Sequence, residues 1–379
     1  MQKRIRIVSV VIVLVILLIG IIVMNNNSNN KYSFTQDGIR YALTLDGNKV
    51  TSFPSKGMYK VQVTCVGADG KWLYDEWKLA IENITSDDVT CDIKFETIPK
   101  TNLNDYIVSL LESKQGTGKV VNENGYRYEG KNPNNYIWFN NEYWRIIGVF
   151  DSASHGQSGK NLVKIIRGET LDALEWNESK TNDWTASSLK SILNGAYYIA
   201  QDGTSSGYCY GYSTTATANC DYTKRGIQSG YRGMIANVTW YLGGYSDASA
   251  TADAFYGYER GTTVYSGRPK STTGYIGLMY LSDYGYSVLS SSCARTKNLG
   301  SYYTATCAGQ SWLYGKGNEW ILTPNSSYSN YVFTLHHKGN VPYNNVSYAY
   351  VSRPVLYLDA SVYKIDGDGS LNNPYIVGM

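Results

Sequence analysis

The sequence predicts an α+β protein with an N-terminal transmembrane helix, a small antiparallel β-sandwich and a large, loop-rich α+β domain. Three observations carry this prediction: an uncharged apolar run near the N-terminus, short alternating strands up to about residue 97, and mixed strands, helical stretches and Gly/Ser/Tyr-rich segments beyond it. Because 379 residues exceed one usual domain, several units are expected. We divide the chain into residues 1–30, 31–100, 101–125 and 126–379.

Residues 7–24 contain no charged side chain, and Lys3, Arg4 and Arg6 precede them. Such a run is long enough to span a hydrocarbon core of about 30 Å. A cleavable signal peptide is the alternative, but its small-residue cleavage site does not follow Met24. The positive-inside rule places the N-terminus in the cytoplasm. We therefore predict a single-pass cell-membrane protein with an uncleaved anchor, a polar spacer up to residue 30 and its bulk outside the cell.

The charges of the remaining chain balance, because three of the 34 basic residues precede the apolar run and the acidic residues number 31. A neutral chain of this kind is not expected to bind nucleic acid. Aromatic usage is uneven, with 36 Tyr against 7 Phe and 9 Trp. Tyrosine suits recognition surfaces, since it combines a rigid apolar ring with a polar tip, although half-buried β-structure also favours it.

Six cysteines support an extracellular, oxidising location. Fifteen connectivities are possible, and pairing of sequence neighbours is favoured because each such pair closes a short loop within its own segment. No CxxC occurs, so structural zinc and thioredoxin-like redox chemistry are not predicted. The favoured pairs are Cys65 with Cys91, Cys209 with Cys220, and Cys293 with Cys307.

The segment 31–100 contains four short runs of alternating apolar residues separated by turn residues, which predict half-buried antiparallel strands. A Cys65 to Cys91 bridge would join the second and fourth strands. Helical spacing of apolar residues over 102–114 then predicts a short connecting helix. The four runs are residues 41–45, 59–65, 77–81 and 89–95.

The segment 126–379 begins with a predicted hairpin of residues 136–139 and 143–150, followed by a strand over 162–167. Apolar residues at helical spacing predict one helix that starts at Asp183 or Thr185 and ends near Tyr197, and a second over 227–238. Residues 246–315 lack periodicity and predict long irregular loops pinned by a disulfide. The last predicted strands are residues 320–324, 331–335 and 352–358.

Six strings in this segment are notable as a set: residues 134–147, 182–184, 240–245, 320–324, 352–356 and 366–375. They resemble an uncharacterised domain of N-terminally anchored surface proteins of low-GC Gram-positive bacteria. A Trp-containing segment, Gly-rich loops and the closing Arg353-Pro354-Val355-Leu356 are also similar to the C-type lectin-like fold, which formylglycine-generating enzymes share. The resemblance implies a cell-surface location and a lectin-like architecture. It implies no reaction, because the calcium-binding strings of lectins and the reactive cysteine pattern of those enzymes do not occur here.

The sequence contains no complete catalytic or metal-binding motif, but it has two partial patterns. The carboxylates of Glu169, Asp172, Glu175 and Glu178 lie near two tryptophans in the sequence and are the best candidates for polysaccharide hydrolysis, although a solvated loop is the better explanation of this cluster. Asp366-Gly367-Asp368-Gly369 resembles the start of a calcium loop but lacks its glutamate at position twelve. We predict no catalytic residue, no metal ligand and no cofactor.

The favoured hypothesis is binding of a glycan or a surface protein through loops near the last strands, where tyrosine and asparagine alternate. A polysaccharide hydrolase that uses the 169–178 carboxylates is one alternative, and a structural subunit of a surface filament is another. The residues predicted to bind the ligand are Tyr328, Tyr331, Tyr343, Asn344, Asn345 and Tyr348.

Overall fold

The computed structural model describes residues 33–379 apart from 37, 58, 75, 100, 205–208, 210–218 and 304. The predicted anchor at residues 7–24 and the spacer that follows it lie outside the described residues. Among the residues described, no helix is both long enough and apolar enough to cross a bilayer. The chain forms two compact units with their boundary between residues 100 and 101.

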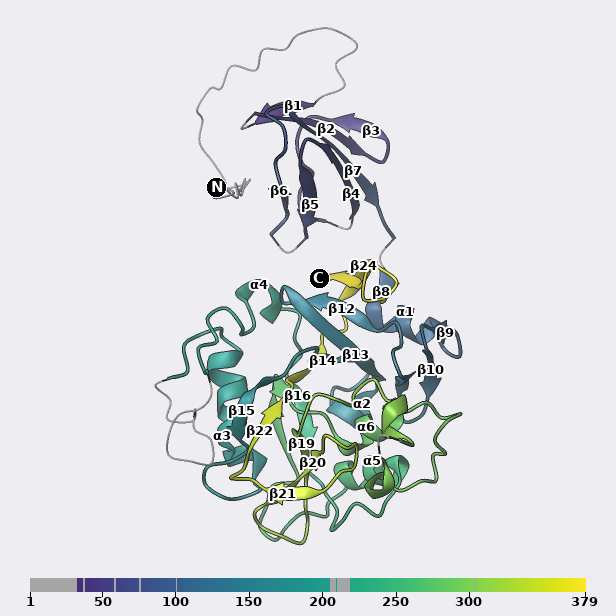
Figure 1. Cartoon of the computed structure of the whole chain (residues 1–379), viewed down its shortest axis with the longest axis vertical. Helices are drawn as coiled ribbons and strands as arrows, with labels where there is room; N and C mark the ends of the chain where they lie inside the picture. Colours follow the sequence, from purple (N-terminus) through teal and green to yellow (C-terminus); the bar gives the residue numbers. More distant parts are fainter. Residues whose placement is uncertain are drawn as a thin grey trace. The chain divides into compact units, whose positions relative to one another are not determined.

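The first unit is a two-layer β structure, coloured purple to dark blue in Figure 1. Its main sheet has the order β1, β2, β7, β4 with β3 beside β2, and β5 pairs with β6 in a separate hairpin. The ring of Trp72 from the hairpin lies 5.1 Å from that of Phe95 on β7, within one shared core. The strands are β1 Phe34–Gln36, β2 Ile39–Leu45, β3 Asn48–Val50, β4 Tyr59–Val66, β5 Asp69–Leu73, β6 Lys78–Glu82 and β7 Val89–Thr97.

Strands β2 and β7 run parallel, from Ile39 opposite Val89 to Leu45 opposite Phe95. The prediction of a purely antiparallel sandwich is therefore wrong at this pair. A parallel pair needs a long connection, and the chain supplies one by forming β3, β4, β5 and β6 between the two strands. The other pairings within this unit are antiparallel.

All three disulfides form between the predicted sequence neighbours. Cys65 and Cys91 are direct partners across β4 and β7, with their Cα atoms 4.1 Å apart. The other two bridges, Cys209 to Cys220 and Cys293 to Cys307, close short loops in the second unit. Three disulfides are typical of proteins that mature in an oxidising compartment, which agrees with an extracellular location.

The second unit is mixed α+β and is built on an 11-stranded sheet that curls into a half-barrel. All six residues of β14 are buried, because β13 and β23 flank this strand and other elements cover it. The path runs β18, β23, β14, β13, β12, β25, β24, β8, with β11, β10 and β9 branching from β13. The bounds are β8 Thr101–Asn102, β9 Lys114–Gln115, β10 Gly118–Asn122, β11 Tyr126–Gly130, β12 Tyr136–Phe139, β13 Glu142–Phe150, β14 Leu162–Arg167, β18 Ile276–Gly277, β23 Val355–Leu358, β24 Tyr363–Asp366 and β25 Tyr375–Gly378.

The predicted hairpin at the start of this sheet is confirmed as β12 and β13, with Phe139 opposite Glu142. Its two turn residues, Asn140 and Asn141, both have positive φ, 58° and 59°. A two-residue turn between twisted strands requires this conformation, and asparagine tolerates it well. The predicted strand over 162–167 is confirmed as β14.

Residues 101–125, predicted as a helical linker, belong to the second unit. The predicted helix is present as α1, Leu103–Ser109, and it buries Leu103 and Ile107 in the core of this unit. Strand β8 pairs with β24, and β10 pairs with β11. The segment therefore contributes to the sheet in addition to connecting the two units.

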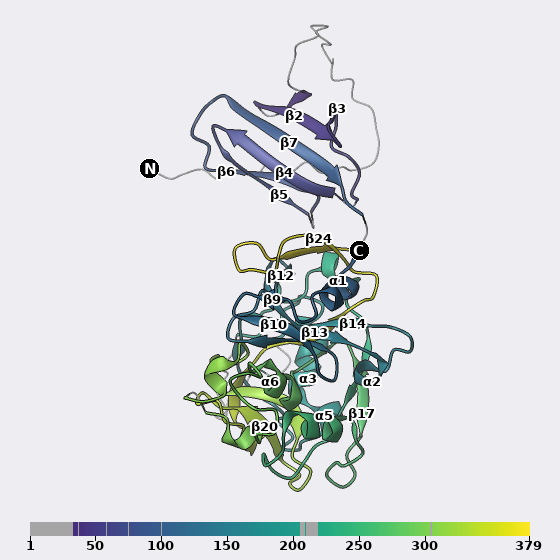
Figure 2. The ribbon, with the colours of Figure 1, turned by 90° about the vertical axis from the view of Figure 1, so that its right-hand side faces the viewer.

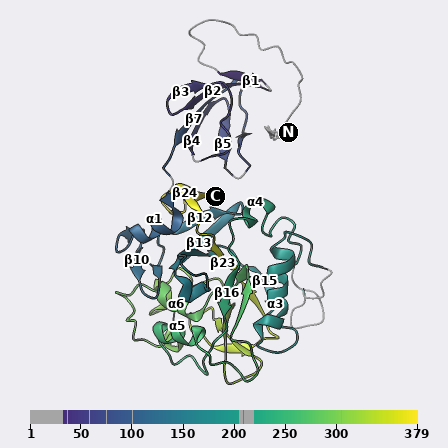
Figure 3. The ribbon, with the colours of Figure 1, turned by 180° about the vertical axis from the view of Figure 1, so that it is seen from behind.

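The helices of the second unit differ from the prediction in two places. Residues 227–238 form only the single turn α4, and Val238 already begins β16. Residues 246–315, predicted as irregular, contain α5 and α6, which lie side by side in Figure 2. Helix α3 is confirmed next to β15, and it continues into a π-helical turn at Leu193–Tyr197 (Figure 3). The bounds are α2 Ser152–His155, α3 Ser188–Ile192, α4 Ser229–Arg232, α5 Ala252–Arg260 and α6 Leu281–Ser287.

A second, five-stranded sheet in this unit has the order β15, β22, β19, β20, β21. It carries the residues predicted to bind a ligand. A two-stranded ribbon of β16 and β17 completes the strands described. The bounds are β15 Leu171–Glu175, β16 Val238–Tyr241, β17 Ser271–Gly274, β19 Glu319–Pro324, β20 Tyr331–Leu335, β21 Tyr343–Asn345 and β22 Ala349–Ser352.

Candidate functional site

Three of the predicted tyrosines meet on strands β20 and β21 and the loop before them. The antiparallel register places Tyr343 opposite Phe333 and Asn345 opposite Tyr331. Because side chains alternate along a strand, Tyr331 and Tyr343 are on the same face as diagonal neighbours. Tyr328 adds a third ring from the loop that precedes β20. We call Tyr328, Tyr331 and Tyr343 the tyrosine triad.

The rings of the tyrosine triad are close together and accessible. Their centroids are 5.5 to 5.8 Å apart in all three pairs. Tyr328 is 49% exposed and Tyr343 is 36% exposed, whereas Phe333 is fully buried 6.0 Å from Tyr343. The buried ring supports the exposed ones from within the core. The triad thus presents a small apolar surface with phenol groups at its edge.

The other predicted residues do not belong to this cluster. The Asn344 side chain projects to the opposite face and donates to Thr334 Oγ1 over 2.8 Å. Asn345 Oδ1 accepts from the backbone N–H of Ser347, so this side chain closes a turn. Tyr348 lies against Tyr350, with centroids 6.1 Å apart, and Tyr350 packs on Trp320. These contacts explain the three residues as parts of the local structure.

Asn182 fixes the loop that carries the triad, although it is distant in the sequence. Its side-chain amide donates to the carbonyl oxygens of Asn325, Tyr328 and Tyr331 at 2.8, 2.8 and 3.1 Å. Its Oδ1 accepts from Arg268 Nε at 3.2 Å. Asn182 is only 3% exposed, and its bond to Asn325 is buried whereas the other three are partly buried. Residues 325–331 are therefore held in one conformation by a buried amide.

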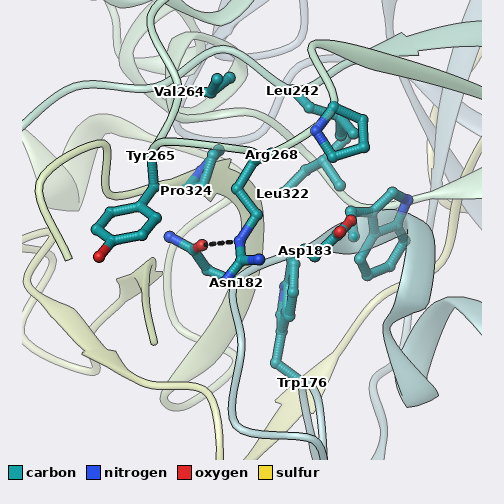
Figure 4. Close-up of a pocket in the computed structure, with 11 residues that line it drawn as sticks. Trp176, Asn182, Asp183, Leu242, Val264, Tyr265, Arg268, Leu322 and Pro324 are labelled. Carbon is teal, nitrogen blue, oxygen red and sulfur yellow. Dashed lines mark hydrogen bonds between the residues drawn. The ribbon is translucent and has the colours of Figure 1, made fainter. Parts of the chain in front are cut away.

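Arg268 completes this arrangement, which we call the loop clamp (Asn182 and Arg268). Its Nη2 donates to the carbonyl oxygen of Ser329 at 3.3 Å. A small pocket lies beside the clamp and is lined by Trp176, Tyr265 and Pro324 among others. Figure 4 shows Arg268 beside Asn182, with the bond between them dashed and Tyr265 next to the amide. Asn182 and Arg268 therefore line this pocket and also hold the loop of residues 325–331.

Asn182 and Arg268 were not predicted as site residues. Asn182 occurs in the Asn182-Asp183-Trp184 string, which entered the sequence analysis only through the resemblance. Asp183 Oδ1 accepts from the N–H of Thr185 and begins a short 3₁₀ turn, so it positions its neighbour. No sequence spacing connects residue 182 to residues 325–331.

Of the acidic candidates for hydrolysis, Glu169 and Asp172 form ion pairs, Glu178 is exposed and Glu175 is half-buried. The Glu169 side chain is 76% exposed and bonds Lys316 at 2.9 Å. Asp172 bonds Arg225 at 3.3 Å and also accepts from the backbone N–H of Asn219. Burial and the nearby Glu178 raise the pKa of Glu175. Glu169 and Asp172 are therefore engaged by cations, and Glu175 and Glu178 are the two acids of this group that influence each other.

Within the described ranges, no three His, Cys, Asp or Glu side chains are grouped so that they could hold an ion. Asp368 Oδ1 accepts from the N–H of Ser370, and Gly367 and Gly369 adopt positive φ. A tight turn therefore accounts for the Asp-Gly string near the end of the sequence.

Comparisons of the chain with protein-family models, with curated proteins and with solved structures found no match.

Proposed function

We propose that the protein binds a ligand outside the cell through the tyrosine triad and performs no catalysis with these residues. The observation that carries this proposal is the cluster of three partly exposed rings on a rigid loop and strand pair. Exposed tyrosines supply contact area at low cost in side-chain entropy, and their hydroxyl groups provide hydrogen bonds. Pre-ordering by the loop clamp reduces the entropy lost on binding.

The surroundings of the triad favour an uncharged contact surface. Between Trp320 and Ser352 the sequence has one formally charged residue, Lys338. Arg268 contacts the loop at Ser329, where its Nη2 is engaged by a carbonyl oxygen. A glycan or the neutral surface of a neighbouring protein therefore suits the site better than a polyanion.

The proposed setting is the outer face of a cell membrane. Residues 7–24 would anchor the chain with the N-terminus in the cytoplasm, and the three disulfides support maturation in an oxidising compartment. A lectin-like architecture of the second unit, as the resemblance implies, would place the ligand site in its loops. Tyr328 lies in the loop before β20, and Tyr331 and Tyr343 are the first residues of β20 and β21.

The test is a binding screen of the full chain in detergent against an array of glycans and bacterial and host surface proteins. Any partner found is then measured with Tyr328→Ala and Tyr343→Ala. Each variant is expected to weaken binding about fivefold, since one ring contact contributes about 1 kcal/mol. Tyr303→Ala is the matched control, because Tyr303 is also 49% exposed but lies in the disulfide loop of Cys293 and Cys307. Absence of any partner, or equal effects of all three variants, would refute the proposal.

A further inference from the structure

Lys164 and Asp283 form a fully buried pair in the core of the second unit. Lys164 is on β14, Asp283 is on α6, and neither side chain is exposed at all. Lys164 Nζ lies 2.5 Å from Asp283 Oδ2. Four aromatic rings surround Nζ, with centroids 4.5 to 5.8 Å away: those of Phe150, Trp240, Tyr280 and Tyr357. An amine and a carboxyl group are thus held in contact in a dry aromatic box.

The two oxygens of this carboxyl group have different partners. Oδ1 accepts from Arg127 Nη1 at 2.9 Å, and the Arg127 side chain is itself buried. Oδ2 contacts Lys164 Nζ and accepts from the backbone N–H of Tyr280 at 2.9 Å. A guanidinium fixed on one oxygen stabilises negative charge there when a nucleophile adds to the carbon. The nucleophile and this stabilising group thus contact the two oxygens of one carboxyl group.

Buried positive charge exceeds buried negative charge around this pair. Arg127, Lys164 and Arg260 face two acids, Asp283 and Glu259. Burial raises the pKa of Glu259, so this acid tends toward its neutral form. Burial also lowers the pKa of the Lys164 ammonium to about 8, against the attraction of Asp283. Burial opposes ionisation of Asp283, but Lys164 and Arg127 lower its pKa to about 2, so the resting pair is an ammonium and a carboxylate. Passage of one proton from Nζ to Oδ2 across their 2.5 Å contact gives the uncharged amine and the carboxylic acid, which are the forms that react.

We propose that Lys164 and Asp283 condense to an intramolecular amide bond. The Nζ lone pair adds to Cγ, so that the Nζ–Cγ bond forms and the Cγ–Oδ2 bond breaks. Oδ2 leaves as water with two protons of the original ammonium, and the third proton stays on the amide nitrogen. The reaction requires no oxidant, reductant or activating group. Oδ1 becomes the amide oxygen and keeps its hydrogen bond from Arg127.

Two physical effects favour this product. A fixed contact between reacting groups corresponds to effective concentrations of about 10⁵ to 10⁸ M. A neutral amide also avoids the desolvation penalty that a buried ammonium and carboxylate pay. The bond would tie β14 to α6 across 119 positions of sequence, a far longer loop than any of the three disulfides closes. The second unit would then resist unfolding even after reduction.

The deciding measurement is the intact mass of the full chain, reduced and denatured. The expected mass is lower than the calculated mass by one water molecule. Trypsin should fail to cleave after Lys164, and the peptides that contain Lys164 and Asp283 should appear joined. Lys119 with Glu112 is the internal control, because this exposed pair has a similar separation of 2.6 Å and should remain two separate side chains.

The calculated mass without loss of water would overturn the proposal. Loss of water that maps elsewhere, for example to a succinimide at Asp366-Gly367, would overturn it as well. Lys164→Met and Asp283→Ala should each restore the full calculated mass. If neither variant folds, the intact mass and the peptide map of the wild-type chain still decide.

Discussion

One amide of Asn182 serves three carbonyl oxygens, and Arg268 holds the same side chain from its other end. The pair connects a segment near residue 182 to the loop that carries Tyr328. The position of the tyrosine triad therefore depends on residues that do not belong to it. This dependence gives the first of four predictions.

Asn182→Ala should destabilise the second unit and weaken ligand binding together. The substitution removes the side-chain donor to the carbonyl oxygens of Asn325 and Tyr328, which costs about 1 to 3 kcal/mol, and it releases the loop of Tyr328; the carbonyl oxygen of Tyr331 keeps the N–H of Asn325 as its donor. Denaturant unfolding and binding to the ligand found in the screen measure the two effects. Asn104→Ala is the control, since Asn104 is half-buried, its amide donates only to the carbonyl oxygen of Asn161, and its Oδ1 accepts from the adjacent N–H of Asp105. Unchanged binding in a folded Asn182→Ala chain would show that the clamp does not order the site.

Arg353→Met should lower the free energy of unfolding by about 3 to 5 kcal/mol. Arg353 and Glu319 are 2% and 1% exposed as side chains and share two hydrogen bonds of 2.8 Å. Removing the cation leaves a buried carboxylate without its partner. Glu112→Gln, which removes an exposed pair with Lys119, should cost no more than about 1 kcal/mol. Similar losses for both variants in urea unfolding would contradict this expectation.

His155 should make stability fall in mild acid. The ring is fully buried; Nε2 contacts the carbonyl oxygen of Phe150, and Nδ1 accepts from the N–H of Gln157. Burial lowers the pKa of His155 below its ordinary 6.5, although the Phe150 bond opposes this. The folded state therefore favours the neutral imidazole of His155 over the protonated one. The free energy of unfolding decreases as pH falls from about 6.5 toward the pKa of His155 in the folded state.

The check for His155 is thermal unfolding of the wild type and His155→Gln at about pH 7.5 and about pH 5. Glutamine keeps hydrogen-bonding groups at the site but does not titrate in this range. The wild type should lose more stability between the two conditions than the variant. Equal losses would assign the acid sensitivity to other groups.

Replacing both Cys65 and Cys91 by serine should cost the first unit about 3 kcal/mol, since the bridge closes a loop over 26 positions. Hydrogen exchange should rise in β4 and β7, which the two residues join. Exchange in β20 and β21 of the second unit serves as the control and should not change. Protection that persists in β4 and β7 would mean that their pairing alone is sufficient.

The strands and disulfides of the fold were largely predictable because their signals are local. Alternating apolar residues identify β4, β6 and β7, and Asn140-Asn141 identifies the β12–β13 turn. Parallel pairing of β2 with β7 leaves no such local signal. A pattern of apolar residues also predicted a helix over 227–238, where glycines and neighbouring strands produce only one turn.

Helices α5 and α6 were missed because their glycines obscure the pattern. Gly285 in α6 is explained by packing, since a Cβ at this position would lie 2.6 Å from Cβ of Ala252 in α5. In the candidate site, composition identified the tyrosine triad, but it also selected Asn344 and Asn345, whose side chains serve local turns and pairs. The loop clamp was beyond prediction, since Asn182 lies 143 positions or more from its carbonyl partners.

Strand β25 lies inside the large sheet, between β12 and β24, and β24 in turn pairs with β8 at the beginning of the second unit. A chain that emerges stepwise from a ribosome or a translocation channel therefore keeps β12 with an open edge until residues 375–378 have arrived. Closure of the second unit is a late, long-range event, which slows folding. In the proposed extracellular setting, late closure of the sheet would leave the chain unfolded while it passes through the translocation channel.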